Sequence, residues 1–452
     1  MRVLMVNKFH YLRGGSETYH FAVGEALEQM GHEVAWFAME DSKNLPCRQS
    51  RYFVSASDYT GKTSPLKKVK DGLSLVYSLE ARRKFEGLLK EFRPDVIHLN
   101  LVHRQLTFSI LDAPYLKEHP VPVVYTAHDY IPICPACTML DGAGRVCDAC
   151  LDGRFRHCLE RRCVKGSRIK SALAAIEAVF LRWHGSYRKI DRIIAPSEFM
   201  RKKLLEGGFP AEQVVRMCNF AKDAVLSRAH RDEDRTDHER PYLLFFGRLS
   251  KEKGIDVLVD AFLSIADCIS GWRLVIAGEG PEREAIEAQL AGHQEGARVE
   301  LVGFQRGAAL NTFIEGASLA IVSSRCRENM PFSIVEAFAA GTPVIGSRIG
   351  GIPELVSDDG TGFLAEPGDA VSLAEAILRG VELCSDAGAY RAMQFCCRSF
   401  VLGNCNQSCY IDALVSLYRK LIELKAKERS SSMSAFCSGR PLTRRRDENG
   451  GV

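Results

Sequence analysis

The chain has 452 residues, of which 46% are hydrophobic and 26% charged, and this composition is typical of a globular protein with more than one domain. Its formal net charge of +4 is too small to indicate nucleic-acid binding by itself, and no apolar stretch approaches the roughly 18 uncharged residues of a membrane span. The opening MRVLMVNKF predicts a strand rather than a signal peptide, so we expect a cytoplasmic protein whose 16 cysteines are mostly reduced thiols.

The first half of the chain predicts strands that alternate with helices. RVLMV (2–6) is an apolar strand, and the loop after it contains Gly14 and Gly15 before apolar residues recur at helical spacing up to Gly31. A strand, glycine loop, helix and strand in this order indicate a parallel pair joined by a right-handed crossover. Further apolar runs predict strands at 33–38, 95–99, 121–127 and 191–197.

The same pattern restarts after a polar stretch at 230–241, which we interpret as a linker. Apolar runs in this second half predict strands at 242–249, 272–278, 298–303, 319–324 and 343–347. We therefore predict an α/β protein with two doubly wound parallel-sheet domains, whose loops at the carboxyl ends of the strands would face each other across a cleft. The expected divisions are a first domain at 1–225, a second domain at 226–405, a helix at 406–425 that packs back on the first domain, and a disordered tail at 426–452.

Two motifs directly follow strands of the second half. FGRLSKEKG (246–254) places Arg248 and Lys253 on a loop that enters a helix, where cations and helix N–H groups can converge on one anion. A solvated basic loop is the alternative interpretation. AGEGP (277–281) is a glycine turn at which the backbone can approach a ligand closely, although glycine turns after strands are common.

A third motif, ENMPFSIVE (328–336), has a glutamate at each end. Pro331 suits the first turn of a helix that Gly341 ends, so Glu328 lies on the loop before the helix. Glu336 then lies about 7–8 Å along the helix axis from Pro331, and the helix N-terminus between the two glutamates would favour a phosphate. That geometry suits a sugar at one end, a diphosphate in the middle and a ribose at the other; the alternative is two glutamates that only flank a helix start.

Taken together, these segments resemble a known family. GGSE (14–17), FGRLSKEKG, GEGP, ENMPFSIVEAFAAGTPVIGS and GGIPELV (350–356) match, in order, the pattern of the retaining glycosyltransferases of family four, which are related to glycogen and sucrose synthases. The resemblance runs from residue 1 to about 425. It implies the GT-B fold of two Rossmann-like domains, an acceptor-side first domain and a second domain that binds a nucleotide sugar. The implied reaction transfers that sugar, with retention and without a metal or other cofactor, to a saccharide or lipid-linked precursor of polysaccharide or lipopolysaccharide.

The resemblance also implies roles for the matching positions. Glu328 would contact the donor sugar as a nucleophile or as support for oxocarbenium charge, and His128 would face the same sugar from the first domain. Arg248 and Lys253 would bind the diphosphate and stabilise the leaving nucleotide, while Glu336 would hold the ribose. These are the candidate catalytic and ribose-binding residues; the other donor-binding candidates are Gly14, Gly15, Gly247, Gly278, Gly280, Val302, Gly303, Met330, Pro331 and Phe332. A histidine at a strand end is more often structural, and that alternative stays open for His128.

A cysteine-rich insertion is expected at about 130–165. Two C-x-x-C units in it have zinc-ligand character, because thiolates at that spacing can share one tetrahedral ion. The corresponding structural zinc site would consist of Cys134, Cys137, Cys147 and Cys150. Cys158, Cys163 and His157 leave the ligand set ambiguous, and unliganded or redox-active thiols are the alternative.

The helix predicted after this insertion, at 171–190, carries Leu173, Ile176, Val179 and Phe180 at helical spacing near basic residues. We interpret it as a packed helix of the first domain. The alternative is a membrane-surface helix, which would place the protein at the inner face of a membrane.

Other functions remain open at this point. A sugar-nucleotide epimerase or a phosphorylase shares the GT-B architecture, but the glutamate pair argues against the first and the lack of a pyridoxal-phosphate lysine context against the second. A non-catalytic carbohydrate-binding or metal-sensing protein would be favoured only if Glu328, Arg248 and Lys253 were dispensable.

Overall fold

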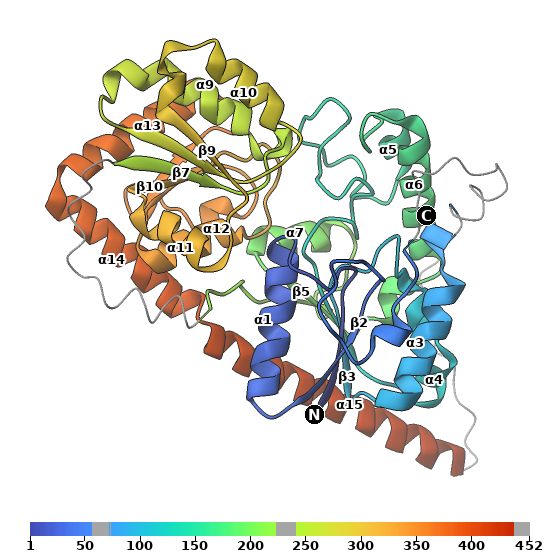
Figure 1. Ribbon diagram of the computed structural model, residues 1–452. Coiled ribbons are helices and arrows are strands. Elements are labelled where there is room, and N and C mark those ends of the chain that lie inside the picture. Colours follow the sequence, from blue (N-terminus) through green and yellow to red (C-terminus); the bar gives the residue numbers. More distant parts are fainter. Residues whose placement is uncertain (57–71, 73, 223–240, 438–452) are drawn as a thin grey trace.

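The computed structural model describes residues 1–56, 72, 74–222 and 241–437 (Figure 1). The predicted linker therefore lies outside the described residues, apart from Pro241 at its end. Within the described ranges, none of the helices combines the length and the apolarity that crossing a membrane requires.

The first half forms a six-stranded parallel sheet with the strand order β2-β1-β3-β4-β5-β6. The strands are β1 (Arg2–Val6), β2 (Glu33–Phe37), β3 (Val96–Leu99), β4 (Val123–Thr126), β5 (Arg192–Ala195) and β6 (Val214–Arg216). The helices around it are α1 (Gly15–Gln29), α3 (Leu79–Phe92), α4 (Pro114–Glu118), α5 (Arg156–Glu160), α6 (Arg168–Trp183) and α7 (Glu198–Glu206). The edge strand β6 was not predicted, because its three residues are too few to show a periodic pattern.

The second half forms another six-stranded parallel sheet, in the order β12-β11-β10-β7-β8-β9. Its strands are β7 (Tyr242–Phe246), β8 (Arg273–Ala277), β9 (Val299–Gly303), β10 (Leu319–Val322), β11 (Val344–Ser347) and β12 (Gly362–Ala365). Its helices are α9 (Ile255–Ile265), α10 (Arg283–Ala291), α11 (Gly307–Gly316), α12 (Phe332–Ala340), α13 (Ala370–Ser385) and α14 (Ala387–Asn404). The predicted α/β class with two doubly wound parallel sheets is confirmed.

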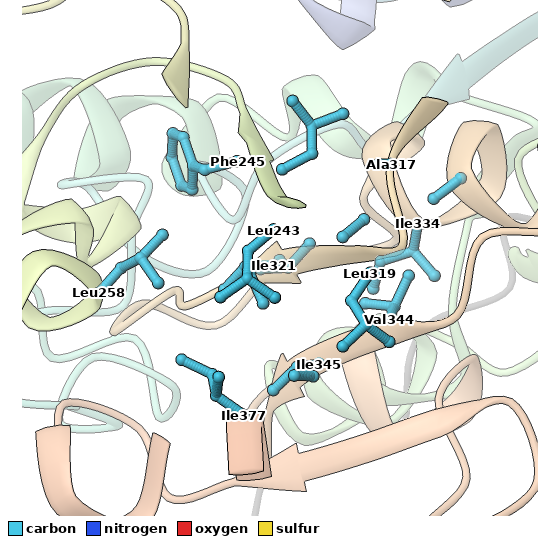
Figure 2. Packing of buried hydrophobic residues seen from close by; sticks show 14 of the residues in the cluster. Leu243, Phe245, Leu258, Ala317, Leu319, Ile321, Ile334, Val344, Ile345 and Ile377 are labelled. Carbon is cyan, nitrogen blue, oxygen red and sulfur yellow. The ribbon is translucent and has the colours of Figure 1, made fainter. Parts of the chain in front are cut away.

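The strands are apolar along their whole length because helices cover both faces of each sheet. Figure 2 shows part of the buried cluster of the second half, to which Leu243 of β7, Ile321 of β10, Ile345 of β11 and Ile334 of α12 belong. These four side chains are at most 1% exposed. Each buried side chain of this size contributes about 1.5–3 kcal/mol relative to an exposed one, and this core fixes the position of α12.

The last helix, α15 (Gln407–Cys437), leaves the second half and runs back beside α1 and the chain start (Figure 1). Its Tyr410 and Tyr418 are buried against Val3 and Met5 of β1, and the Tyr410 hydroxyl hydrogen bonds to that of Tyr19 at 2.6 Å. The helix continues to Cys437, whereas the sequence predicted disorder from residue 426. Residues 438–452 lie outside the described range.

Candidate active site

Glu328 and Lys253 form a close ion pair at the carboxyl end of the second sheet. Glu328 lies on the loop between β10 and α12, and its Oε1 is 2.6 Å from Nζ of Lys253 and accepts a 2.7 Å hydrogen bond from Oγ of Ser324. Burial by itself would raise the pKa of Glu328, but the Lys253 charge and these hydrogen bonds hold that pKa below its usual value. Burial likewise opposes the charge of Lys253, and Glu328 raises its pKa. Glu328 is therefore a stable carboxylate at neutral pH.

The glycines of GGIPELV (350–356) pack against this carboxylate loop. Gly350 has φ +62°, and a Cβ on it would lie 2.3 Å from the backbone oxygen of Glu328. The N–H of Gly351 donates to the same oxygen at 2.8 Å. A side chain at Gly350 would push the loop away, so this glycine positions Glu328.

Residues of the first half hold the same loop from the opposite side. The Tyr130 hydroxyl donates to the Glu328 backbone oxygen at 3.4 Å. The Asn329 side chain donates to the Ala127 backbone oxygen at 2.7 Å and accepts from Oγ of Ser197 at 2.8 Å. These contacts place Glu328 beside the end of β4. The sequence reasoning missed Tyr130 and Asn329 as positioning residues, since no local pattern shows which distant group a polar side chain will meet.

His128, one residue beyond Ala127, is neutral in this environment. Its Nε2 hydrogen bonds to Oδ1 of Asn100 at 2.9 Å, and the Asn100 amide Nδ2 bonds to Nδ1 of His20 at 3.1 Å. Burial lowers the pKa of His128 to about 3. The Asn100 oxygen can only accept, so Nε2 carries the proton and Nδ1 is an acceptor. No described residue hydrogen bonds to that Nδ1, so it can accept from a ligand hydroxyl.

The start of α12 meets the glycine loop of the first half. A Cβ on Gly15 would lie 3.0 Å from the Phe332 ring, so the start of α1 and the start of α12 come together across the two halves. Neither helix has a side-chain cap on its first N–H groups. Both helix N-termini carry partial positive charge and free donors, which is a typical setting for an anion.

Pro331 and Met330 precede this helix start. Pro331 is the cap residue of α12, one position before the first turn in which the sequence placed it, and Gly341 ends the helix at φ +79° as predicted. The Met330 backbone oxygen accepts from the Asn219 side chain at 2.8 Å, which fixes the approach of the chain to the helix.

Glu336 lies within α12 and is half-buried. Burial raises its pKa to about 7, and the charge of Lys222 opposes this shift. Among the described residues its carboxyl group has no hydrogen-bond partner, so both oxygens can accept from ligand hydroxyls.

Arg248 is exposed, and it makes no hydrogen bond or ion pair within the described ranges. The sequence placed it with Lys253 as a pair of diphosphate ligands, but Lys253 is engaged by Glu328. The glycines of AGEGP support the Arg248 loop, since a Cβ on Gly278 would lie 1.9 Å from the Gly247 oxygen and one on Gly280 2.1 Å from the Leu249 oxygen. Their direct contact with a donor stays a prediction.

The donor-binding candidates Val302 and Gly303 lie at the end of β9. Val302 and Gly303 are half-buried, and Gly303 has φ +70°. A Cβ on Gly303 would lie 3.3 Å from Oε1 of Glu279, in the AGEGP turn, while Phe304 is 61% exposed. These contacts bring the end of β9 next to the turn that supports Arg248.

The buried face of α6 differs from the prediction. Ser171, Ala174, Ala175, Ala178 and Leu181 are buried, whereas Ile176 is 58% and Val179 54% exposed. The expected buried stripe is therefore wrong at these two positions, because the small alanine side chains allow the cysteine-rich segment to approach α6 closely.

Both halves of the chain match glycosyltransferase family models. The model "Glycosyltransferase Family 4" matches residues 13–222, and "Glycosyl transferases group 1" matches residues 227–386. An uncharacterized 42.6 kDa protein of the Klebsiella pneumoniae cps region is 23% identical over 78% of this chain and 87% of its own length. Lipopolysaccharide 1,2-N-acetylglucosaminetransferase of Salmonella typhimurium is 33% identical over 42% of this chain, which spans about half (53%) of that enzyme.

Solved structures share the whole fold. Anabaena HepE in complex with UDP matches with a TM-score of 0.64 and 18% identity, over 93% of this chain and 100% of that one. Sucrose-phosphate synthase of Thermosynechococcus elongatus matches with a TM-score of 0.65 and 20% identity, over 94% and 99% of the two chains. With two parallel sheets in this arrangement and glycosyltransferase models matched in both halves, the chain belongs to the GT-B glycosyltransferases.

Proposed function

We propose that the protein transfers a sugar from a nucleoside-diphosphate sugar to a saccharide or lipid-linked acceptor, with retention of the anomeric configuration. The observation that carries this proposal is the ionised Glu328, held by Lys253 beside His128 and the two facing helix N-termini. One carboxylate for the sugar and a separate set of positive groups for the diphosphate are what cleavage of a sugar–phosphate bond requires.

In the proposed reaction, positive charge develops at the anomeric carbon and negative charge on the departing diphosphate. Glu328 offsets the first charge, and Arg248 with the N-termini of α1 and α12 offsets the second. Oε1 of Glu328 is occupied by Lys253 and Ser324. This favours electrostatic support by Glu328 over nucleophilic attack, because hydrogen bonds to a carboxylate oxygen reduce its basicity.

Retention then follows from attack on the same face from which the nucleotide departs. The leaving phosphate oxygen takes the proton of the acceptor hydroxyl as the new glycosidic bond forms, so no separate base is needed. His128 accepts a hydrogen bond from a donor-sugar hydroxyl through Nδ1, and Glu336 accepts the ribose hydroxyls. In this scheme, positive groups of the chain itself balance the negative charge of the departing diphosphate.

The proposed acceptor class rests on relatives named for surface polysaccharides. Besides the lipopolysaccharide enzyme of Salmonella, an amylovoran biosynthesis glycosyltransferase of Erwinia amylovora is 28% identical over 42% of this chain and 47% of its own length. We therefore favour a growing polysaccharide or a lipopolysaccharide precursor as acceptor.

The exposed side of α6 supports peripheral contact with an anionic membrane. Ile169, Ile176 and Trp183 recur at seven-residue spacing along the helix and are 83%, 58% and 81% exposed. Exposed Arg168 and Lys170 lie at its start. An apolar stripe beside cations is typical of an interfacial helix. Sedimentation with phosphatidylglycerol vesicles should fall severalfold in an Ile176→Asp, Trp183→Asp protein; equal sedimentation would count against the membrane contact.

The transfer proposal is tested by a thermal-shift screen of nucleoside diphosphates and nucleotide sugars, followed by transfer assays with the donor that stabilises most. We expect stabilisation by one nucleoside diphosphate, and a product in which the sugar keeps its anomeric configuration. A folded protein that no diphosphate stabilises would contradict the proposal. Epimerisation of the donor without transfer would identify the epimerase alternative instead.

A further inference from the structure

The segment between β4 and α6 has little regular structure of its own. Between residues 130 and 165 it contains only the five-residue α5 and an isolated bridge between Leu140 and Val146. Its cysteines are free thiols. Long loops without secondary structure are uncommon in compact domains unless they are functional, and small loop-rich segments usually need a cross-link or a metal to stay ordered.

Five thiols of this segment line one cavity. They are those of Cys134, Cys147, Cys150, Cys158 and Cys163. Most of the remaining lining is apolar, with Ile133, Met139 and Leu151 among it. Cys137 is not among the lining residues, although the sequence placed it in the zinc site. The tertiary structure thus collects a different set of sulfurs from the one that spacing suggested.

Two of these sulfurs lie near hydrogen-bond donors. Cys134 is close to the backbone N–H groups of Ala136 and Met139. The guanidinium Nη1 of Arg161 lies 3.1 Å from Sγ of Cys147.

Hydrogen bonds from neighbouring groups are what orient the ligands of a metal site. Cys158 differs from the other four in its burial, because it is only 1% exposed and packs in one apolar cluster with Phe155 and Ala178. It therefore supports the ligands by packing and is not one of them.

We propose that Cys134, Cys147, Cys150 and Cys163 bind one Zn²⁺ as a structural Cys₄ site. In the described part of the chain, no group of three or more ligating side chains already stands in a metal-binding arrangement. Rotation about χ1 moves a cysteine sulfur without moving the backbone, and the four cysteines line the same cavity. Tetrahedral thiolate coordination, at about 2.3 Å per Zn–S bond, would then cross-link the four cysteines of the segment.

This metal site would also fix a residue that contacts the loop of Glu328. Asp148, between Cys147 and Cys150, accepts from both terminal nitrogens of Arg327, with Nη2 2.6 Å from Oδ2. Arg327 directly precedes Glu328. A rigid turn at 147–150 therefore holds the carboxylate loop through a bidentate ion pair. The zinc site itself does not depend on the proposed transfer reaction.

The test is the zinc content of the full chain purified under reducing conditions without chelator. We expect about one zinc per chain, as for other structural Cys₄ sites, and at least a tenfold loss of zinc in Cys147→Ser and Cys163→Ser. The matched control Cys137→Ser, in the same segment, and the exposed Cys409→Ser should keep their zinc.

A wild-type protein that holds no zinc, even after incubation with Zn²⁺, would overturn the proposal, as would a bound iron–sulfur cluster or a mass deficit that shows a disulfide. Loss of zinc in Cys137→Ser would overturn the ligand set. Because serine variants can unfold, the wild-type chain is also reconstituted with Co²⁺. The absorption spectrum of the cobalt-loaded protein should show the thiolate-to-cobalt charge transfer of a tetrahedral site. A spectrum typical of octahedral oxygen ligands would refute the proposed site.

Discussion

Replacing Lys253 by methionine tests whether its ammonium keeps Glu328 ionised. The variant keeps the length and most of the apolar stem of the side chain, but it removes the group 2.6 Å from the Glu328 carboxylate. Hydrogen bonds to charged groups contribute about 1.5–3 kcal/mol. The Lys253 side chain is 34% exposed, so solvent screens part of this interaction. We expect the free energy of unfolding at pH 7 to fall by about 1.5–2 kcal/mol.

The difference in unfolding free energy between the wild type and Lys253→Met should depend on pH. In the wild type the pKa of Glu328 lies below its usual 4.5. The pair therefore stabilises the fold above that usual value and loses its effect as the pH falls through the lowered one. In the variant, burial without the ammonium raises the pKa of Glu328. Its carboxylate destabilises the fold above this raised pKa and is neutralised on acidification. The stability difference between the two proteins should therefore shrink toward about pH 4.

The measurement is urea unfolding at several pH values, with the pH profile of kcat beside it. Lys251→Met is the matched control, because Lys251 lies in the same short turn and is exposed. We expect the kcat of Lys253→Met to decline on acidification where the wild type is still on its plateau. Equal unfolding free energies for the two variants at pH 7, or a pH-independent deficit in Lys253→Met, would refute this account of the pair.

Four further predictions concern the donor site. Glu328→Gln should lower kcat by about 10²–10³-fold, as for loss of one transition-state charge partner. Isothermal titration should still detect nucleoside-diphosphate binding to this variant. Loss of that binding would show that Glu328 contacts the nucleotide instead of the sugar. Arg248→Ala should weaken diphosphate binding by about 10–100-fold in the same titration, and unchanged binding would remove it from the site. Gly15→Val should weaken diphosphate binding as well, because a Cβ at position 15 lies only 3.0 Å from the Phe332 ring. Full affinity in this variant would show that binding does not need the starts of α1 and α12 together. The affinity for nucleoside diphosphate should rise with pH through the Glu336 pKa of about 7, because the ionised carboxyl accepts hydrogen bonds from the ribose hydroxyls. Glu336→Gln should flatten this part of the affinity–pH profile. A profile identical to that of the wild type would contradict the ribose role of Glu336.

Sequence reasoning identified the two sheets because each rests on local properties. Runs such as LAIV at 319–322 are apolar throughout, and a strand covered on both faces needs no partner information to be recognised. The ends of α12 were predictable for the same reason, since Pro331 fixes its own φ and Gly341 tolerates the positive φ at which the helix ends. The order of the glycine and glutamate motifs was enough to indicate the glycosyltransferase family, which the family models then matched.

The tertiary structure alone decided which side chains meet. Glu328 pairs with Lys253 and Asn329 reaches Ala127 over long separations in the chain, and periodicity carries no information about such contacts. The buried face of α6 and the sulfurs of the cysteine cavity were also decided by packing: alanines face the cysteine-rich segment, and Cys163 lines the cavity whereas Cys137 does not. Backbone preferences are local and therefore legible in the sequence, whereas the charge state of Glu328 and the composition of the cavity depend on neighbours that only the fold brings together.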